Sequence, residues 1–429
     1  MTASETHRAI DAIWKIESAR LIAGLARIVR DVGLAEDLAQ DALLAALEQW
    51  PAAGIPDNPG AWLMAAGKHR AIDQLRRGER LERKHAELGR ELEARQERAG
   101  PELAAARDAA LDDEVGDDLL RLVFTCCHPA LSLEARVALT LKLLGGLTTD
   151  EIARGFLVGE ATIAQRIVRA KRTLNEQRVP FETPRGPELG ERLASVLAVV
   201  YLIFNEGYSA TAGDDWVRPA LCEDALRLGR ILAGLAPREP EVLGLVALME
   251  LQASRLRART GPAGEVVLLL EQDRSRWDRL LIGRGLAALQ RAAELPGPPG
   301  AYRLQAEIAA CHARASAAEQ TDWRRIVALY GELARVSPSP VIELNRAVAL
   351  AMAEGPAAGL QRVDALLSEP ALAGYHLLPS VRGDLLFKLG RRDEARGEFE
   401  RAAALTRNAR ERDLLLGRAA ACGGREASR

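Results

Sequence analysis

The sequence has few aromatic residues and few cysteines. These two shortages argue against a sheet-rich fold and against a fold held by disulfides. Phe, Trp and Tyr make up 4% of the 429 residues, whereas Ala, Leu, Arg and Glu dominate, and this composition favours helices over sheet. No stretch shows the clear alternation of a half-buried strand. The five cysteines are odd in number and scattered, so we do not expect a disulfide framework. The composition therefore predicts an all-α protein.

Long apolar runs are missing as well. No run approaches the ~18 apolar residues of a membrane-spanning helix, and the first residues lack the basic-then-apolar pattern of a signal peptide. A hydrophobic content of 48% and a charged content of 28% are typical of a soluble globular protein. We therefore expect a cytoplasmic location and no membrane partner. At ~150 residues per domain, the chain is long enough for about three domains.

The chain also lacks an excess of charge of either sign, since its net charge is −2. The charges are not spread evenly, however. Basic residues gather between positions 68 and 84, where Asp73, Glu79 and Glu82 are the acidic residues among Lys68, Arg70, Arg76, Arg77, Arg80, Arg83 and Lys84. Because the screening length in cells is only ~8 Å, local patches decide the electrostatic footprint. A nucleic-acid-binding surface is therefore compatible with the net charge.

Residues 36–77 carry the most specific pattern in the sequence: an acidic helix, a break and a basic helix. Apolar residues recur at helical spacing in the first helix, at Leu38, Ala42, Ala45 and Ala46. Its acidic residues are expected on the remaining surface, at Glu36, Asp37 and Asp41. Proline and glycine interrupt the chain between Pro51 and Gly60, and a basic helix carrying Trp62 follows from Ala61. This combination suits a protein that binds a basic protein surface with one helix and nucleic acid with the next.

The same residues resemble region two of bacterial RNA polymerase sigma factors, most closely the extracytoplasmic-function group. The resemblance is carried by Glu36-Asp37-Leu38-Ala39-Gln40-Asp41, by Ala61-Trp62-Leu63 and by Arg70-Ala71-Ile72-Asp73-Gln74-Leu75-Arg76-Arg77. It implies that the first helix docks on the polymerase clamp helices through Asp37, Gln40 and Asp41. It also implies that the second helix melts and reads the promoter −10 element, through Trp62, Lys68, His69, Arg70, Asp73, Arg76 and Arg77. His69 stands where the family commonly has Asn, which leaves open the base captured there.

A helix-turn-helix pattern follows at residues 148–177. Thr148 and Glu151 form a capping box that starts a short helix ending at Phe156, and a turn through Gly159 leads to a second helix from Glu160 to about Gln177. The expected buried stripe of the second helix is Ile163, Ile167, Ala170 and Leu174. An ordinary basic helix on a helical bundle would look similar. The run from Leu147 to Leu174, however, resembles sigma region four, which reads the −35 element. The residues assigned to −35 DNA are Thr162, Gln165, Arg166, Arg169, Lys171 and Arg172.

About 240 further residues follow, and their pattern is helical and repetitive. Tyr201-Leu202-Ile203-Phe204-Asn205-Glu206-Gly207-Tyr208, together with Phe124-Thr125-Cys126-Cys127-His128-Pro129, resembles the sigma subgroup that carries a long helical C-terminal extension. Small and aromatic residues fit a tetratricopeptide repeat at Gly383, Leu386, Ala395, Phe399 and Ala402. Equivalent positions at Ile326, Gly359 and Ala395 are spaced by 33 and 36 residues, close to the ~34-residue period.

We divide the chain into five segments. The expected order is sigma region two (1–79), a charged linker (80–118), the region-four helix-turn-helix domain (119–179), a helical extension (187–300) and tetratricopeptide-like repeats (301–425). Cys126, Cys127 and His128 lack the paired spacing of a zinc site and are interpreted as buried helix residues. We expect neither a metal nor a cofactor.

The function predicted from these segments is promoter recognition without catalysis. The protein would direct core RNA polymerase to −35 and −10 elements, and its own extension would regulate it. The expected partners are core RNA polymerase, promoter DNA, and a regulatory protein or ligand bound to the extension. The short, proline-containing tether from Arg178 to Pro187 favours an extension that packs on the sigma domains.

Two alternatives remain at this point. Residues from 187 onward could form an enzyme domain fused to a DNA-binding module, with Glu206, Asp214 and Asp215 as its acids. The chain could also be a repressor-like regulator that uses the helix-turn-helix alone. A repressor-like regulator would not need the acidic and basic helices of residues 36–77.

Overall fold

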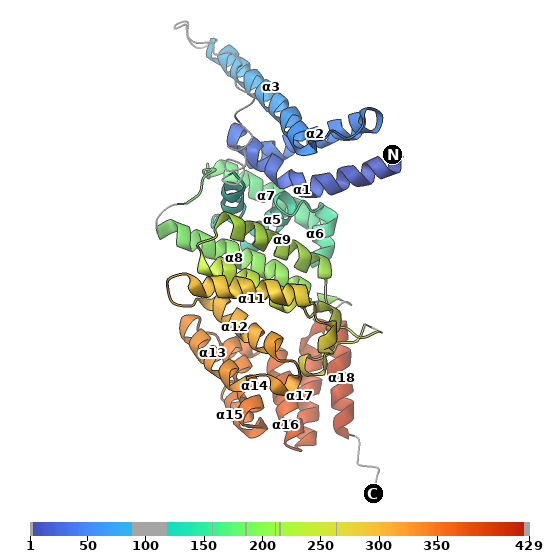
Figure 1. The fold of residues 1–429 in the computed structure, drawn as a ribbon, viewed down its shortest axis with the longest axis vertical. Coiled ribbons are helices and arrows are strands. Elements are labelled where there is room, and N and C mark those ends of the chain that lie inside the picture. Colours follow the sequence, from blue (N-terminus) through green and yellow to red (C-terminus); the bar gives the residue numbers. More distant parts are fainter. Residues whose placement is uncertain are drawn as a thin grey trace. The chain divides into compact units, whose positions relative to one another are not determined.

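The computed structural model describes residues 3–87, 118–156, 158–184, 187–210, 212–213, 216–262 and 264–423. Helices make up 77% of the structure, which confirms the all-α prediction (Figure 1). Within the described ranges, the strands amount to one parallel pair of two residues each, β1 (Ala212–Gly213) and β2 (Arg407–Asn408). The chain divides into two compact units, Met1–Val199 and Val200–Arg429.

The first unit begins with three helices that correspond to the predicted region two. They are α1 (Ala3–Val29), α2 (Val32–Ala53) and α3 (Pro59–Glu87). Asp31 caps α2, because its carboxylate accepts a hydrogen bond from the backbone N–H of Leu34 at 3.0 Å. The helix ends at Gly54, whose φ of 87° lies in the left-handed region that favours glycine. The chain therefore breaks inside the predicted proline- and glycine-rich segment.

The helix α3 runs beyond the predicted end of region two. It continues to Glu87, so residues 80–87 of the expected linker are helical. The rest of that linker, residues 88–117, lies outside the described residues. The segment boundaries proposed from the sequence stay predictions.

The predicted helix-turn-helix follows in the same unit. After a helical segment at 118–126 come α5 (Leu133–Leu143), α6 (Thr149–Phe156) and α7 (Glu160–Glu176). The capping box before α6 is confirmed, because the backbone N–H of Thr148 donates to the Glu151 carboxylate at 2.7 Å. In return, the N–H of Glu151 donates to the Thr148 hydroxyl at 3.1 Å. The next helix is α8 (Pro187–Tyr208), and the division between the two units falls within it.

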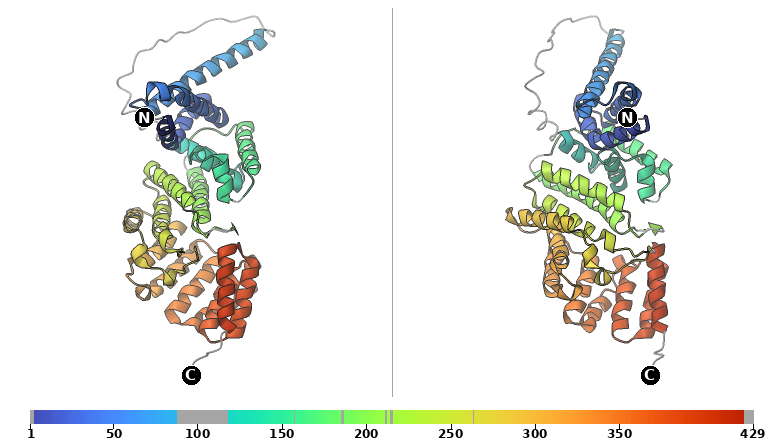
Figure 2. Two further views of the ribbon diagram at one scale, coloured as in Figure 1. Left: turned by 90° about the vertical axis from the view of Figure 1, so that its right-hand side faces the viewer. Right: turned by 45° about the vertical axis from the view of Figure 1, so that its right-hand side comes forward.

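The second unit is a succession of helices that pack against their neighbours in the chain (Figure 2). Its α-helices are α9 (Pro219–Leu235), α10 (Pro240–Ala253), α11 (Arg279–Glu294), α12 (Ala301–Arg314), α13 (Trp323–Val336), α14 (Pro340–Glu354), α15 (Pro356–Asp364), α16 (Leu377–Lys388), α17 (Arg392–Leu405) and α18 (Ala409–Gly423). Its 3-10 helices are η1 (Leu256–Ala258), η2 (Leu269–Glu271), η3 (Arg274–Arg276), η4 (Ala318–Gln320) and η5 (Pro370–Leu372). The helix α10 packs on α9, α11 and α12, and it is buried along most of its length.

The predicted repeat positions lie where neighbouring helices touch. A Cβ atom added to Gly383 would lie 2.9 Å from the Phe399 ring, and one added to Gly359 would lie 2.5 Å from the Cβ of Ala351. Ala395 and Phe399 belong to the core between α16, α17 and α18. Small residues thus allow close approach of paired helices, which is the reason that tetratricopeptide-like repeats need them.

Candidate nucleic-acid interface

The acidic helix α2 presents the three residues predicted to bind core polymerase on its exposed side. Its opposite side is buried, at Leu38, Ala39, Ala42, Ala45 and Ala46. Asp37, Gln40 and Asp41 are all exposed. Gln40 also donates a hydrogen bond to Glu36, at 2.9 Å. The two exposed carboxylates therefore lie one helical turn apart, on a surface that a basic protein partner can reach.

The burial of Glu36 differs from what the sequence predicts. We expected its carboxylate on the surface with Asp37 and Asp41, but Glu36 is only 3% exposed. Its carboxylate lies 3.7 Å from the Nζ of Lys142 on α5 and forms a second ion pair with Lys171 on α7. Because a buried carboxylate is costly without opposite charge, the two lysines compensate the burial of Glu36. Helical periodicity within α2 could not reveal this contact, since both partners come from the helix-turn-helix domain.

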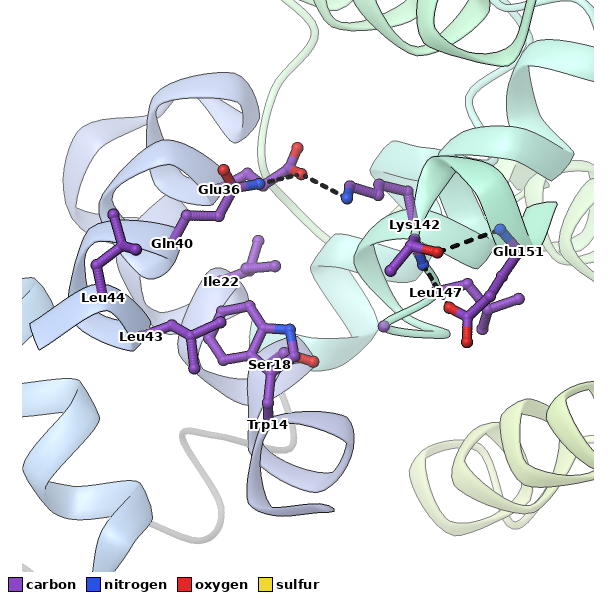
Figure 3. Close-up of a pocket in the computed structure, with 12 residues that line it drawn as sticks. Trp14, Ser18, Ile22, Glu36, Gln40, Leu43, Leu44, Lys142, Leu147 and Glu151 are labelled. Atoms are coloured by element: carbon purple, nitrogen blue, oxygen red, sulfur yellow. Dashed lines mark hydrogen bonds and ion pairs between the residues drawn. The ribbon is translucent and has the colours of Figure 1, made fainter. Parts of the chain in front are cut away.

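A cavity of about 600 Å³ lies beside this ion pair (Figure 3). Residues from α1, α2 and α5, and from the segment around the start of α6, line it. They include Trp14, Gln40, Leu44, Lys142 and Glu151. In Figure 3, Glu36 and Lys142 face each other across one side of the cavity, and Gln40 lies next to Glu36. The predicted polymerase-binding surface of α2 is therefore next to the helix-turn-helix domain in this structure.

The helix α3 carries the residues predicted to bind the −10 element. Trp62 is half-buried and packs edge-to-face on the buried Trp50, with ring centroids 5.3 Å apart. Trp62 is therefore anchored by another indole instead of being enclosed in the core. An aromatic side chain held in this way can serve as a stacking surface for an unpaired base.

The polar residues of α3 differ in their exposure. The side chain of His69 is 81% exposed, and its Nδ1 lies 3.6 Å from the carboxylate of Asp73 one turn later. Lys68 and Arg70 are half-buried, whereas Arg76 is exposed. Arg77 belongs to α3, but its side chain lies outside what the structure describes. A surface pair such as His69 with Asp73 is weak, so DNA can replace it at little cost.

The helix α7 has the two faces predicted for a recognition helix. The expected buried stripe is confirmed at Ile163, Ile167, Ala170 and Leu174. Of the predicted −35 residues, Thr162, Gln165, Arg169 and Arg172 are exposed, and Arg166 is half-buried. Arg172 donates a hydrogen bond to Glu176 at 2.7 Å. The exposed face can therefore offer Arg and Gln side chains to base edges and phosphates.

Lys171 is the exception among the predicted −35 residues. It is half-buried and paired with Glu36, and the next turn of α7 is also held by α2, because Asn175 donates to the Asp31 carboxylate at 2.7 Å. A single ammonium group that pairs with Glu36 is not available to a DNA phosphate. Contact of Lys171 with DNA thus requires Lys171 to give up its ion pair with Glu36.

The Phe124–His128 motif anchors the beginning of α8. Arg192 donates to the carbonyl oxygen of Phe124 at 3.0 Å, and Ser195 donates to that of Cys127 at 2.9 Å. Burial raises the pKa of the Cys127 thiol to about 11, although a hydrogen bond with Thr140 opposes this shift. The thiol therefore stays protonated and unreactive at neutral pH. Among the described residues, no group of three His, Cys, Asp or Glu side chains could hold a metal ion.

Glu206, considered as an acid of an enzyme, is held in a salt bridge. It is 8% exposed, and its carboxylate lies 2.5 Å from the guanidinium of Arg218. The backbone N–H of Arg218 also donates to the carbonyl oxygen of Gly207 at 2.7 Å. Glu206 therefore stabilises the position of Arg218, the residue that precedes α9. Asp214 and Asp215, the other two candidate acids, lie outside the described residues.

Three family models match the chain. Residues 16–81 match sigma-70 region 2, residues 121–174 match sigma-70 region 4, and residues 192–293 match a family of unknown function, DUF6596. The chain is 30% identical over 154 residues to SigK of Mycobacterium ulcerans (strain Agy99), which is named an ECF RNA polymerase sigma factor. The match covers 35% of this chain and 75% of SigK. The chain belongs to the extracytoplasmic-function family of RNA polymerase sigma factors.

This sigma factor also resembles a relative of similar length. An uncharacterized protein of Rhizobium meliloti (strain 1021) is 46% identical over 388 residues, which cover 90% of this chain and 89% of the relative. The match therefore reaches beyond the two sigma regions into the extension. The sigma regions imply core RNA polymerase and promoter DNA as partners. Separately, the described helices include none that is both long and apolar enough to cross a membrane.

Proposed function

We propose that this sigma factor binds core RNA polymerase through the exposed face of α2, opens and reads the −10 element with α3, and reads the −35 element with α7. The observation that carries the proposal is the division of α7 into two faces. One face is buried in the helix-turn-helix domain, while Gln165, Arg169 and Arg172 are exposed on the other. Such a helix suits the major groove.

The proposed opening step needs no catalytic residue. Strand separation uses binding energy, because α3 must favour single-stranded over paired DNA by enough to offset a few kcal/mol of unstacking. Trp62 would stack on a released base, and Lys68, Arg70 and Arg76 would neutralise nearby phosphates. The chemistry of RNA synthesis stays with the polymerase.

The core-binding role of α2 can be tested by reversing one charge. If Asp41 faces a basic polymerase surface, Asp41→Arg should weaken core binding by on the order of 1–3 kcal/mol, mainly by slowing association. Glu354→Arg makes the same change of charge at an exposed position at the end of α14 and should leave the affinity unaltered. A fluorescence titration with purified core polymerase measures both. Equal affinity of Asp41→Arg and the wild type would exclude this contact.

We further propose that the extension controls the sigma domains. Support comes from the start of α8, where Arg192 and Ser195 hydrogen-bond to the backbone of the helix-turn-helix domain. In addition, Arg136 on α5 donates to the Ser195 hydroxyl at 2.8 Å. Removing the chain after about residue 185 would remove these contacts along with the rest of the extension. We therefore expect truncation to abolish transcription rather than raise it.

A further inference from the structure

The second unit contains a cavity of about 390 Å³ that the sigma function does not use. Side chains from the end of α8 and from α10, α12, α13 and α14 line it. Its polar lining includes Tyr201, Gln252, Arg255, Gln305 and Tyr330, and its apolar lining includes Leu248 and Ile308. The volume falls in the range of ~300–1,000 Å³ that is typical of small-molecule sites. Polar and apolar side chains line the cavity in similar numbers, which suits a ligand that has both a polar and an apolar part.

The lining carries a positive charge and contains no Asp or Glu. Arg255 is half-buried, and among the described residues it contacts the neutral side chains of Tyr208 and Trp277. It donates to the Tyr208 hydroxyl at 2.7 Å, and its guanidinium lies 5.8 Å from the centroids of the Tyr208 and Trp277 rings. In the described part of the chain, no carboxylate oxygen lies within ion-pair distance of Arg255. Its charge is therefore available to an anion in the cavity.

Two further arginines strengthen this positive field. Arg274 donates to the carbonyl oxygens of His312 and Ala315, both at 2.6 Å, and its guanidinium lies over the Trp277 ring. The guanidinium of Arg259 lies 3.8 Å from the centroid of the Tyr208 ring. Burial lowers the pKa of Arg259 and of Arg274, and the charge of Arg255 contributes to both shifts. Arg274 also lies near Glu319, whose negative charge partly offsets that of Arg274. The positive charge that remains around Arg255 favours binding of an anion.

His312 supplies an unpaired polar group in the same cavity. It lines the cavity and is 8% exposed, and its Nδ1 has no hydrogen-bond partner among the described residues. Burial, with further contributions from Arg255 and Arg274, lowers its pKa to about 3. The ring is therefore neutral at physiological pH. This ring nitrogen is therefore available for a hydrogen bond to a ligand in the cavity.

We propose that this cavity binds a small amphipathic monoanion, whose acidic group pairs with Arg255 and whose apolar body lies against Tyr201, Tyr330 and Ile308. One singly charged group matches the single guanidinium that lines the cavity. A dianion would bring a second charge into a site whose remaining polar lining is neutral. Because apolar side chains line part of the cavity, an anion with an apolar body should bind more tightly than a hydrated ion such as inorganic phosphate.

Binding can be tested on the full-length protein with two dyes of the same ring system. Anilinonaphthalene sulfonate carries one negative charge, whereas N-phenyl-1-naphthylamine has none. We expect saturable binding of the sulfonate, at least tenfold tighter than that of the neutral dye. Arg255→Gln should remove this preference. Arg257→Gln, which removes an exposed charge two residues away, should retain it.

A second variant keeps the test valid if Arg255→Gln fails to fold. Asn345 lines the cavity at an exposed position, so Asn345→Asp places a carboxylate there without disturbing the core. This substitution should weaken binding of the sulfonate at least fivefold and leave the neutral dye unaffected. The proposal is overturned if both dyes bind equally, or if sulfonate binding is the same in the wild type, Arg255→Gln and Asn345→Asp. Because neither polymerase nor DNA is present, failure here would leave the proposed sigma function untouched.

Discussion

Glu36 connects the two promoter-binding domains of the first unit through a buried carboxylate. Glu36→Gln would keep the size of the side chain but weaken its attraction for Lys142 and Lys171. The freed lysines should then raise the affinity of the isolated protein for duplex DNA by about 1 kcal/mol, or roughly fivefold. Fluorescence anisotropy at fixed salt measures this change.

The matched control is Glu48→Gln, which removes an exposed negative charge from the same helix. This variant measures how much the loss of any one negative charge from α2 raises the affinity for DNA. If Glu36→Gln and Glu48→Gln raise DNA affinity equally, Lys171 is not held back by Glu36.

The arginines of α7 should divide into base-reading and phosphate-binding residues. Arg166→Ala should lower affinity for the cognate promoter and relax preference at one −35 base pair, by about 1–3 kcal/mol if the contact is bidentate. Arg169→Ala and Arg172→Ala should instead weaken binding to all sequences alike. Binding to a set of duplexes, each with one −35 base pair changed, distinguishes the two classes. An even loss for Arg166→Ala would make it a phosphate contact.

At the residue scale, local patterns could be predicted from the sequence and contacts between domains could not. The buried stripe of α7 depends on a 3.6-residue period, which is visible in the helix itself. The same reasoning placed Glu36 on the surface, because nothing in its own helix shows that α5 and α7 cover it. The cavity around Arg255 was also missed, since its lining comes from five separate helices.

At the scale of elements, glycines decide how closely the repeat helices of the second unit approach. Gly383→Ala on α16 would place a Cβ 2.9 Å from the Phe399 ring and 3.2 Å from the carbonyl oxygen of Ala395. Overpacking of this kind costs about 1–3 kcal/mol, which exceeds the gain in helix propensity of up to ~1 kcal/mol. We expect a lower free energy of unfolding and a lower melting temperature for the second unit.

Gly397→Ala on α17 is the control for this substitution. A Cβ at Gly397 would meet no atom within 4 Å, so the substitution should stabilise the helix by up to ~1 kcal/mol. Chemical denaturation of the full-length protein measures both variants. Stabilisation by both, or destabilisation by both, would contradict the packing described for α16 and α17.

The elements themselves were predicted where a sequence signal marks their ends. The capping box at Thr148 and Glu151 marks the start of the helix-turn-helix. The proline- and glycine-rich segment marks the end of α2, although α2 continues past Pro51 to Ala53. The continuation of α3 to Glu87 lacked such a signal, because charged residues suit both a helix and a linker. The strands β1 and β2 are two residues long each, which is too short to show the alternation of apolar and polar residues that predicts a strand.

At the scale of the whole molecule, the sigma regions and the extension occur together in a second protein. The similarity to the Rhizobium meliloti protein covers both parts, at 46% identity over 388 residues. The DUF6596 match begins at Arg192, the residue that hydrogen-bonds to the helix-turn-helix domain. This contact supports our proposal that the extension acts on the sigma domains and is not an independent module.

Promoter-specific transcription in vitro is the decisive measurement for the proposed sigma function. Purified core polymerase is combined with fragmented genomic DNA and with the full-length protein, a version ending at about residue 185, or neither, and the transcript starts are mapped. We expect the full-length protein to produce discrete transcript starts that core polymerase alone does not produce. We expect the truncated version to lose these starts. A full-length protein that adds no specific starts would contradict the sigma function. Full activity of the truncated protein would contradict control by the extension.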